Sequence, residues 1–136
     1  MNYWLLKSEP DVYSWDKFVQ DGRTHWNGVR NHQAANNMKA MKKGDQAFFY
    51  HSNEGKEIVG IVEIVKEAYP DPTDETGKFV MVDIKPVKPL KNPVTLAAIK
   101  THSDLKSMAL VKQSRLSVCP VTAKEWKAVC KEGGIG

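Results

Sequence analysis

Apolar and polar residues recur along the chain first with the period of a strand and then with that of a helix. The apolar run over 3–7 ends at Ser8-Glu9-Pro10, which predicts a short strand because the residue before a proline favours extended backbone. Ser14 is a candidate cap for a short helix that ends at Asp21-Gly22. The apolar face of this helix would carry Trp15, Phe18 and Val19.

A second helix is expected to begin after Asn31, where apolar residues recur every three to four positions. These residues are Ala34, Met38 and Met41. We place the end of this helix just before Gly44, because Lys42 and Lys43 then lie in the last turn, where positive charge is favourable.

The middle of the chain is rich in β-branched and aromatic residues. Runs at 45–51 and 57–66 are separated by Ser52-Asn53-Glu54-Gly55, which is the pattern of a hairpin. A third strand is expected over 78–85, after a loop at 69–77 whose prolines and glycine oppose regular structure.

Two further helices are expected in the last third of the chain. Thr95 can cap a short helix through Lys100, and Thr122 with Glu125 forms a capping box at the start of the last helix. The apolar face of the last helix would carry Trp126, Val129 and Cys130. Several short strands with small helices between them indicate a compact α+β fold around a small, partly open barrel.

Composition adds that the chain is one ordinary domain, since 41% of its 136 residues are hydrophobic and 26% are charged. Cys119 and Cys130 lack the spacing of a zinc site and are too few for a disulfide framework, so we expect neither a bound metal nor a disulfide. No apolar run approaches the roughly 18 residues of a membrane span, so neither insertion nor secretion is indicated. The net charge of +4 is favourable for an anionic partner but does not indicate which kind.

The segment Trp26-Asn27-Gly28-Val29-Arg30-Asn31 joins a large aromatic ring, a guanidinium and two amides directly before the second helix. A tryptophan in a loop can offer its flat face to a nucleobase, and a helix start offers unpaired N–H groups to a phosphate or a base oxygen. The alternative is a core tryptophan, with Asn31 serving only as the helix cap.

Two strand ends also carry polar groups. Lys7-Ser8-Glu9 places a cation, a hydroxyl and a carboxylate where they can read a polar ligand, although the same residues suit a plain strand terminus. Tyr50-His51-Ser52 lies at the mouth of the expected hairpin. Gly60 in the facing strand either admits a group that approaches closely or marks a bulge.

Gln113-Ser114-Arg115 sets a planar donor group beside an amide and a hydroxyl, which suits contact with phosphate, while a solvated loop is the alternative. Enzyme templates fit less well. His51 and Ser52 do not form a catalytic pair, because neighbouring residues of a strand point to opposite faces. Glycine-rich phosphate loops and helical zinc motifs are absent from the sequence, so the residues give no positive support for catalysis.

Six segments, in this order and at these separations, resemble the EVE domain family over nearly the whole chain. They are Trp4-Leu5-Leu6-Lys7-Ser8-Glu9-Pro10, Trp26-Asn27-Gly28-Val29-Arg30-Asn31-His32-Gln33-Ala34, Gly44-Asp45 through Phe49-Tyr50-His51-Ser52, Gly60-Ile61-Val62, Asp71-Pro72-Thr73 and Gln113-Ser114-Arg115-Leu116-Ser117-Val118. Each segment is weak alone, and their order makes the set specific.

The resemblance implies a PUA-like fold, a small mixed β-barrel flanked by short helices, as a single domain over 1–136. It also implies a non-catalytic module that reads a modified base, of the 5-methylcytosine or 5-hydroxymethylcytosine type in DNA, or a modified base in RNA. The base pocket would be formed by Trp26, Lys7, Ser8, Asn31, His51 and Ser52. Contacts to the nucleic-acid backbone would come from Arg30, Arg115, Ser114 and Gln113.

On this hypothesis the protein needs no cofactor, is a monomer, and is cytoplasmic, or nuclear if eukaryotic. The alternative is an enzyme on a PUA-like or ASCH-type scaffold that acts on a nucleoside or a small amide, with Lys7 and Glu9 as its candidate pair. We also expect Trp26 to flank a partly open pocket, because its polar neighbours need solvent or a ligand to satisfy their hydrogen-bonding groups.

Overall fold

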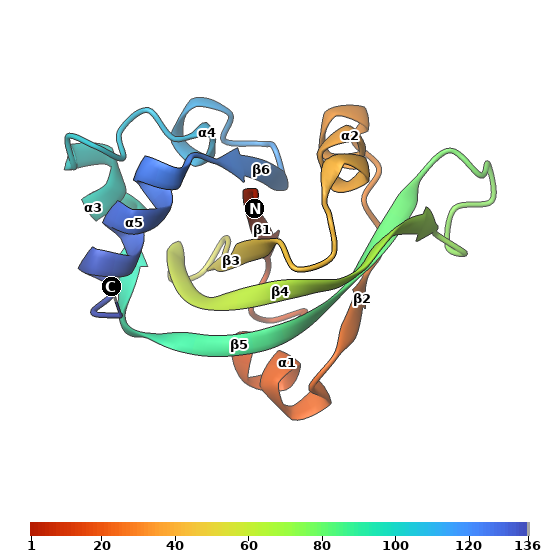
Figure 1. Cartoon of the computed structure of the whole chain (residues 1–136), viewed down its shortest axis with the longest axis horizontal. Coiled ribbons are helices and arrows are strands. Elements are labelled where there is room, and N and C mark those ends of the chain that lie inside the picture. Colours follow the sequence, from red (N-terminus) through yellow and green to blue (C-terminus); the bar gives the residue numbers. More distant parts are fainter. Residues whose placement is uncertain (136) are drawn as a thin grey trace.

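The computed structural model describes residues 1–135, which form one mixed six-stranded sheet surrounded by short helices (Figure 1). The strands are β1 (Tyr3–Ser8), β2 (Thr24–Trp26), β3 (Gln46–His51), β4 (Glu57–Pro70), β5 (Val80–Thr95) and β6 (Val118–Val121). The helices are α1 (Trp15–Asp21), α2 (His32–Ala40), α3 (Leu96–Thr101), α4 (Ala109–Lys112) and α5 (Ala123–Glu132). The α+β class is confirmed.

The sheet has the strand order β2-β5-β4-β3-β1-β6. Strands β1 and β3 are parallel and the other neighbours are antiparallel, so the sheet is mixed as expected. The expectation of a barrel needs correction, because β2 and β6 are two separate edges and the sheet is not closed. Four register shifts along the β4–β5 pair bend these long strands, which gives a strongly curved open sheet (Figure 1).

Local capping signals were reliable. Ser14, Thr95 and Thr122 cap α1, α3 and α5 as predicted, and Thr122 with Glu125 forms the expected capping box. The hairpin between β3 and β4 is also confirmed. Val19 differs from its prediction, because its side chain is exposed and only Trp15 and Phe18 of α1 are buried.

Helix α2 ends at Ala40 and not just before Gly44, so Lys42 and Lys43 follow the helix. The cause is Asp45, a buried carboxylate that accepts hydrogen bonds from the Lys42 N–H at 2.9 Å and from the Trp4 indole at 3.1 Å. These two bonds fix the turn into β3, and the chain leaves the helix three residues early.

Strand β5 runs ten residues beyond the predicted end at Lys85, through three prolines. This is possible because β2 pairs with β5 only over Val82–Ile84, so within residues 1–135 β4 is the only strand paired with the later part of β5. Strands β2 and β6 and helix α4 were not predicted, since three or four residues are too few to show a period.

The centre of the molecule is an aromatic cluster between α1 and the sheet. The ring of Trp15 meets Phe18 and Phe49 edge to face at 5.6 and 5.5 Å, and Phe18 stacks on Phe49 at 5.4 Å. Trp15 also lies against Gly60 of β4, where an added Cβ would be only 2.6 Å from the ring carbons Cζ2 and Cζ3. The sequence left two interpretations of Gly60 open, a closely approaching group and a bulge. Both are confirmed, because the Trp15 ring lies against this glycine and a register shift of β4 occurs at it.

Candidate functional site

An open cavity of about 490 Å³ lies where the end of β1, the edge strand β2 and the start of α2 meet. Its lining comes from four places in the chain: the end of β1 and the following turn, strand β2, the β2–α2 loop, and the residue before β6. The lining residues are Lys7, Ser8, Glu9, Val12, Tyr13, Thr24, His25, Trp26, Asn27, Gly28, Val29, Arg30, Asn31 and Ser117.

Trp26 forms one wall of this cavity and is partly exposed. Its ring meets Phe49 edge to face at 5.8 Å, and its backbone is paired with Val82 of β5. The expectation that Trp26 flanks a partly open pocket is confirmed. Trp26 is the last residue of the three-residue strand β2 and not a loop residue.

Lys7 and Ser8 line the cavity from the end of β1. The Lys7 ammonium donates a hydrogen bond to the carbonyl oxygen of Ser114 at 2.8 Å, and partial burial lowers the pKa of Lys7. The Ser8 hydroxyl donates to the carbonyl oxygen of Tyr13 at 2.6 Å, which leaves its oxygen as an acceptor. Both polar groups are therefore already oriented in the free protein.

Asn31 is both a helix cap and a residue of the cavity, the two roles that the sequence left open. Its side-chain oxygen accepts the Ala34 N–H at 2.9 Å and caps α2, and the residue also lines the cavity. Arg30 lines the cavity too, but its guanidinium is held by the β4–β5 loop. It donates to Asp71 at 3.2 Å and to Thr73 at 2.9 Å, and it lies over the Phe79 ring at 5.5 Å.

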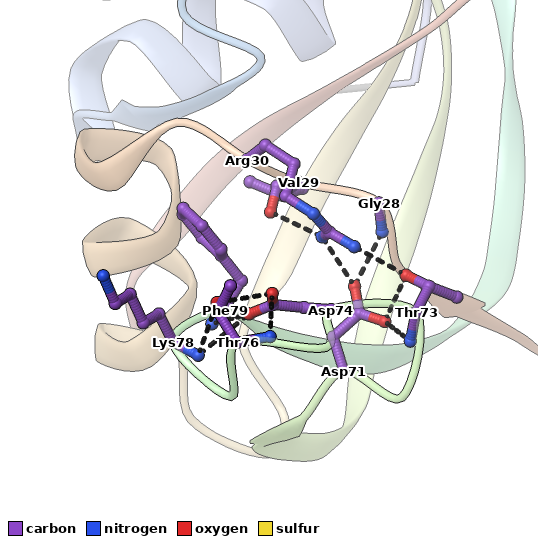
Figure 2. A network of polar contacts seen from close by, with 9 residues as sticks. All are labelled: Gly28, Val29, Arg30, Asp71, Thr73, Asp74, Thr76, Lys78 and Phe79. Carbon is purple, nitrogen blue, oxygen red and sulfur yellow. Dashed lines mark hydrogen bonds and ion pairs between the residues drawn. The ribbon is translucent and has the colours of Figure 1, made fainter.

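Asp71 is the centre of this network, which Figure 2 shows in detail. Its buried carboxylate accepts the Gly28 N–H at 2.8 Å, the Thr73 N–H at 2.8 Å and the Thr73 hydroxyl at 2.6 Å, besides the bond from Arg30. Burial raises the pKa of Asp71, but the hydrogen bonds from Thr73, Gly28 and Arg30 outweigh it and bring the pKa to about 2. The sequence offered Asp71 only as part of a family motif, because its partner Gly28 is 43 residues away.

A second buried carboxylate, Asp83 of β5, lies opposite His25 of β2. It accepts from the His25 ring at 2.8 Å, from Arg23 at 3.0 Å and from the Tyr69 hydroxyl. Burial raises the pKa of Asp83, and the bonds from these three side chains outweigh it and bring the pKa to about 2. The pKa of Tyr69 shifts in the opposite direction, because burial and the neighbouring Asp83 carboxylate raise it to about 12. No sequence pattern indicated this cluster.

The low pKa values of Asp71 and Asp83 predict acid sensitivity. Each folded-state pKa lies near 2, below the unfolded value of about 3.9, so each group contributes stability that is complete above the unfolded value and is lost as pH falls through the folded one. We expect the urea midpoint to be level from pH 7 to about 5 and to fall between about 4 and 2. Asp71→Asn should show a smaller fall over that window, and an equal fall would contradict the assignment.

The other predicted site residues lie around the cavity without lining it. The His51 ring accepts the Trp15 N–H at 3.1 Å, and burial lowers the pKa of this histidine. The Ser52 N–H donates to the Ser8 carbonyl oxygen at 2.8 Å. His51 ends β3 and Ser52 follows it, and the Ser52 bond joins this strand end to Ser8 of the cavity.

Gln113, Ser114 and Arg115 line a separate, shallower depression of about 370 Å³. Asn31 lines this depression as well as the cavity, so the two hollows adjoin at the start of α2. The side chain of Arg115 is exposed, and the Gln113 amide oxygen accepts from Gln33 at 2.8 Å.

Both cysteines are buried and unbonded. Burial raises the pKa of Cys119 to about 11, so this thiol is protonated at neutral pH. Within residues 1–135 the structure contains no group of three or more His, Cys, Asp or Glu side chains that could hold a metal ion. None of the helices in this range is long and apolar enough to cross a membrane.

A curved mixed sheet with short helices around it agrees with the PUA-like fold that the resemblance implied, and an open cavity lies between a strand end and a helix start. The family is found by comparison: a model of the EVE domain matches residues 2–132. Thymocyte nuclear protein 1 of Gallus gallus is 42% identical over 93% of this chain and 66% of its own length. The chain belongs to the EVE domain family, and the resemblance seen in the sequence is confirmed. It spans about two thirds of the length of that curated relative.

Solved structures show the same fold. A protein from Rhodopseudomonas palustris is 66% identical and superposes with a TM-score of 0.94 over 99% of this chain and 94% of its own. Human THYN1 protein, in complex with DNA that contains 5-methylcytosine, is 35% identical with a TM-score of 0.87 over 98% of each chain. A YTH domain of Zygosaccharomyces rouxii shares the fold alone, with 15% identity and a TM-score of 0.60.

Proposed function

We propose that this protein is a non-catalytic module that binds nucleic acid by taking a modified base into the cavity beside Trp26. The favoured base is a cytosine modified at C5, 5-methylcytosine or 5-hydroxymethylcytosine in DNA. The observation that carries the proposal is a partly exposed tryptophan on the wall of an open cavity, in a chain whose human relative is complexed with DNA that contains 5-methylcytosine. In a eukaryote such a protein would work in the nucleus, as the name of the relatives suggests.

The cavity is suited to one extruded base. Its volume of about 490 Å³ falls within the range of about 300–1,000 Å³ typical of small-ligand pockets. Extruding a base costs a few kcal/mol, and stacking on an aromatic ring returns about 1–3 kcal/mol per base. The oxygen of Ser8 and the ammonium of Lys7 supply an acceptor and a donor for the polar edges of the base.

The shallow depression beside the cavity suits the backbone of the same strand. Arg115 is exposed there beside Ser114 and Gln113, and Asn31 joins the depression to the base cavity. A guanidinium on phosphate reads a charge that every nucleotide carries, so this contact adds affinity without selectivity.

Arg115→Ala is therefore expected to weaken binding to modified and unmodified oligonucleotides about equally. Losing one phosphate contact should reduce the slope of log affinity against log salt by about 0.7–0.9. Fluorescence anisotropy titrations at several salt concentrations measure this slope. Lys106→Ala is the control, because this lysine is exposed but lines neither hollow, and it should keep the wild-type slope. If the Arg115 variant keeps the wild-type slope, the nucleic-acid backbone does not bind in this depression.

The proposal itself is tested with wild-type protein and duplexes that differ only in one cytosine. A methyl group read in an apolar pocket discriminates by about 1–3 kcal/mol, so we expect at least about fivefold tighter binding of the modified duplex. Equal affinity for both would refute the reader function. Chromatography of the incubated oligonucleotides and of free nucleosides tests the enzymatic alternative, in which Lys7 and Glu9 at the cavity would act on the base.

A further inference from the structure

We infer that Asp71 and Asp83 are positioning residues that fix the Trp26 wall of the cavity and thereby set its selectivity for a modified base. The inference rests on the proposed function for its ligand. Its structural part, the fixing of the wall, stands on geometry alone.

The segment that carries Trp26 has little support from the sheet. Strand β2 is an edge strand of three residues, paired with β5 only from Thr24 to Trp26. The next five residues up to Asn31 have no regular structure, yet all of them line the cavity. Short edge pairing by itself leaves such a segment free to fray, so other contacts must hold it.

Two buried carboxylates hold this segment on either side of Trp26. Before it, Asp83 accepts from Arg23 at 3.0 Å and from His25 at 2.8 Å. After it, Asp71 accepts from the Gly28 N–H at 2.8 Å and from the Arg30 guanidinium at 3.2 Å. Trp26 lies between these two attachments.

Both carboxylates are rigid supports. Their side chains are almost fully enclosed, with 0% of the Asp71 side chain and 6% of the Asp83 side chain exposed. Asp71 is itself fixed by Thr73, which donates both its N–H and its hydroxyl to the same carboxylate oxygen (Figure 2). A buried charge with all its bonds made resists displacement, because moving it would leave unpaired polar groups.

The same loop provides a matched control in Asp74, also drawn in Figure 2. Its carboxylate accepts four hydrogen bonds, two from Thr76 and one each from the N–H groups of Lys78 and Phe79. Asp71 likewise accepts four. Replacing either residue by Asn removes comparable bonding, but only Asp71 touches the wall of the cavity.

The first measurement needs no nucleic acid. In 15N-labelled protein, Asp71→Asn and Asp83→Asn should each shift the Trp26 indole resonance, and Asp71→Asn should also speed hydrogen exchange at the Gly28 amide. Asp74→Asn should change neither. Thr73→Val, at an exposed position, is the milder variant should the Asp71 variant fail to fold, and it should give a smaller shift of the same resonances. Unchanged Trp26 and Gly28 resonances in the folded variants would overturn the positioning role.

The second measurement uses the matched duplexes. Asp71→Asn and Asp83→Asn should reduce the preference for the modified duplex by about threefold or more, since a loosened wall loses selectivity. The preference is the ratio of the two affinities, and it is compared with that of Asp74→Asn because this variant loses the same negative charge. Asp74→Asn should keep the wild-type preference. If the wild type itself shows no preference, the proposed function fails, and the resonances still decide the positioning role. If the wild type prefers the modified duplex and the Asp71 and Asp83 variants prefer it equally, these residues do not set selectivity, and the proposed function still stands.

Discussion

Replacing Trp26 by alanine is expected to abolish the preference for a modified base. The variant loses the aromatic wall on which the base stacks, and stacking is worth about 1–3 kcal/mol, or about 5- to 150-fold in affinity. Affinity for the modified duplex should fall to that for the unmodified one. The slope of log affinity against log salt should stay at its wild-type value, because Trp26 contacts no phosphate in this proposal. Anisotropy titrations with matched duplexes measure both quantities.

Trp26→Phe is the control for this variant. A phenyl ring keeps a flat face toward the cavity and keeps an aromatic contact with Phe49, so part of the preference should remain. If Trp26→Ala discriminates like the wild type, the base does not bind against this ring, and the cavity would have to take another ligand.

Gly60→Ala is expected to have the largest effect on stability. The added methyl group would be 2.6 Å from two ring carbons of Trp15, and that ring is confined by Phe18 and Phe49. Overpacking of this kind costs about 1–3 kcal/mol of unfolding free energy. Urea unfolding followed by circular dichroism measures the loss.

The Trp15→Phe background gives a direct test of the cause. Phenylalanine lacks the outer ring carbons of tryptophan, so the new methyl group finds room there. Gly60→Ala should then cost much less in Trp15→Phe protein than in the wild type. An equal cost in both backgrounds would mean that the backbone of β4, and not the tryptophan, requires the glycine.

The sequence by itself determined what depends on residues close together in the chain. A cap joins a side chain to an N–H three residues later, so Ser14, Thr95 and Thr122 could be recognised without a structure. The β3–β4 hairpin follows from its turn residues. The order of the six motifs also identified the family, and Trp26 was correctly placed beside an open pocket.

Only the tertiary structure decided how the cavity is held and where helix α2 and the sheet end. Asp71 meets Gly28 across 43 residues, Asp83 meets His25 across 58, and Asp45 ends α2 through a bond to Trp4 across 41. Such contacts leave no period in the sequence, because each joins single residues that folding brings together. The open sheet has the same origin. Whether β2 and β6 meet depends on the curvature of β4 and β5, which their accumulated register shifts set, and no local pattern encodes it.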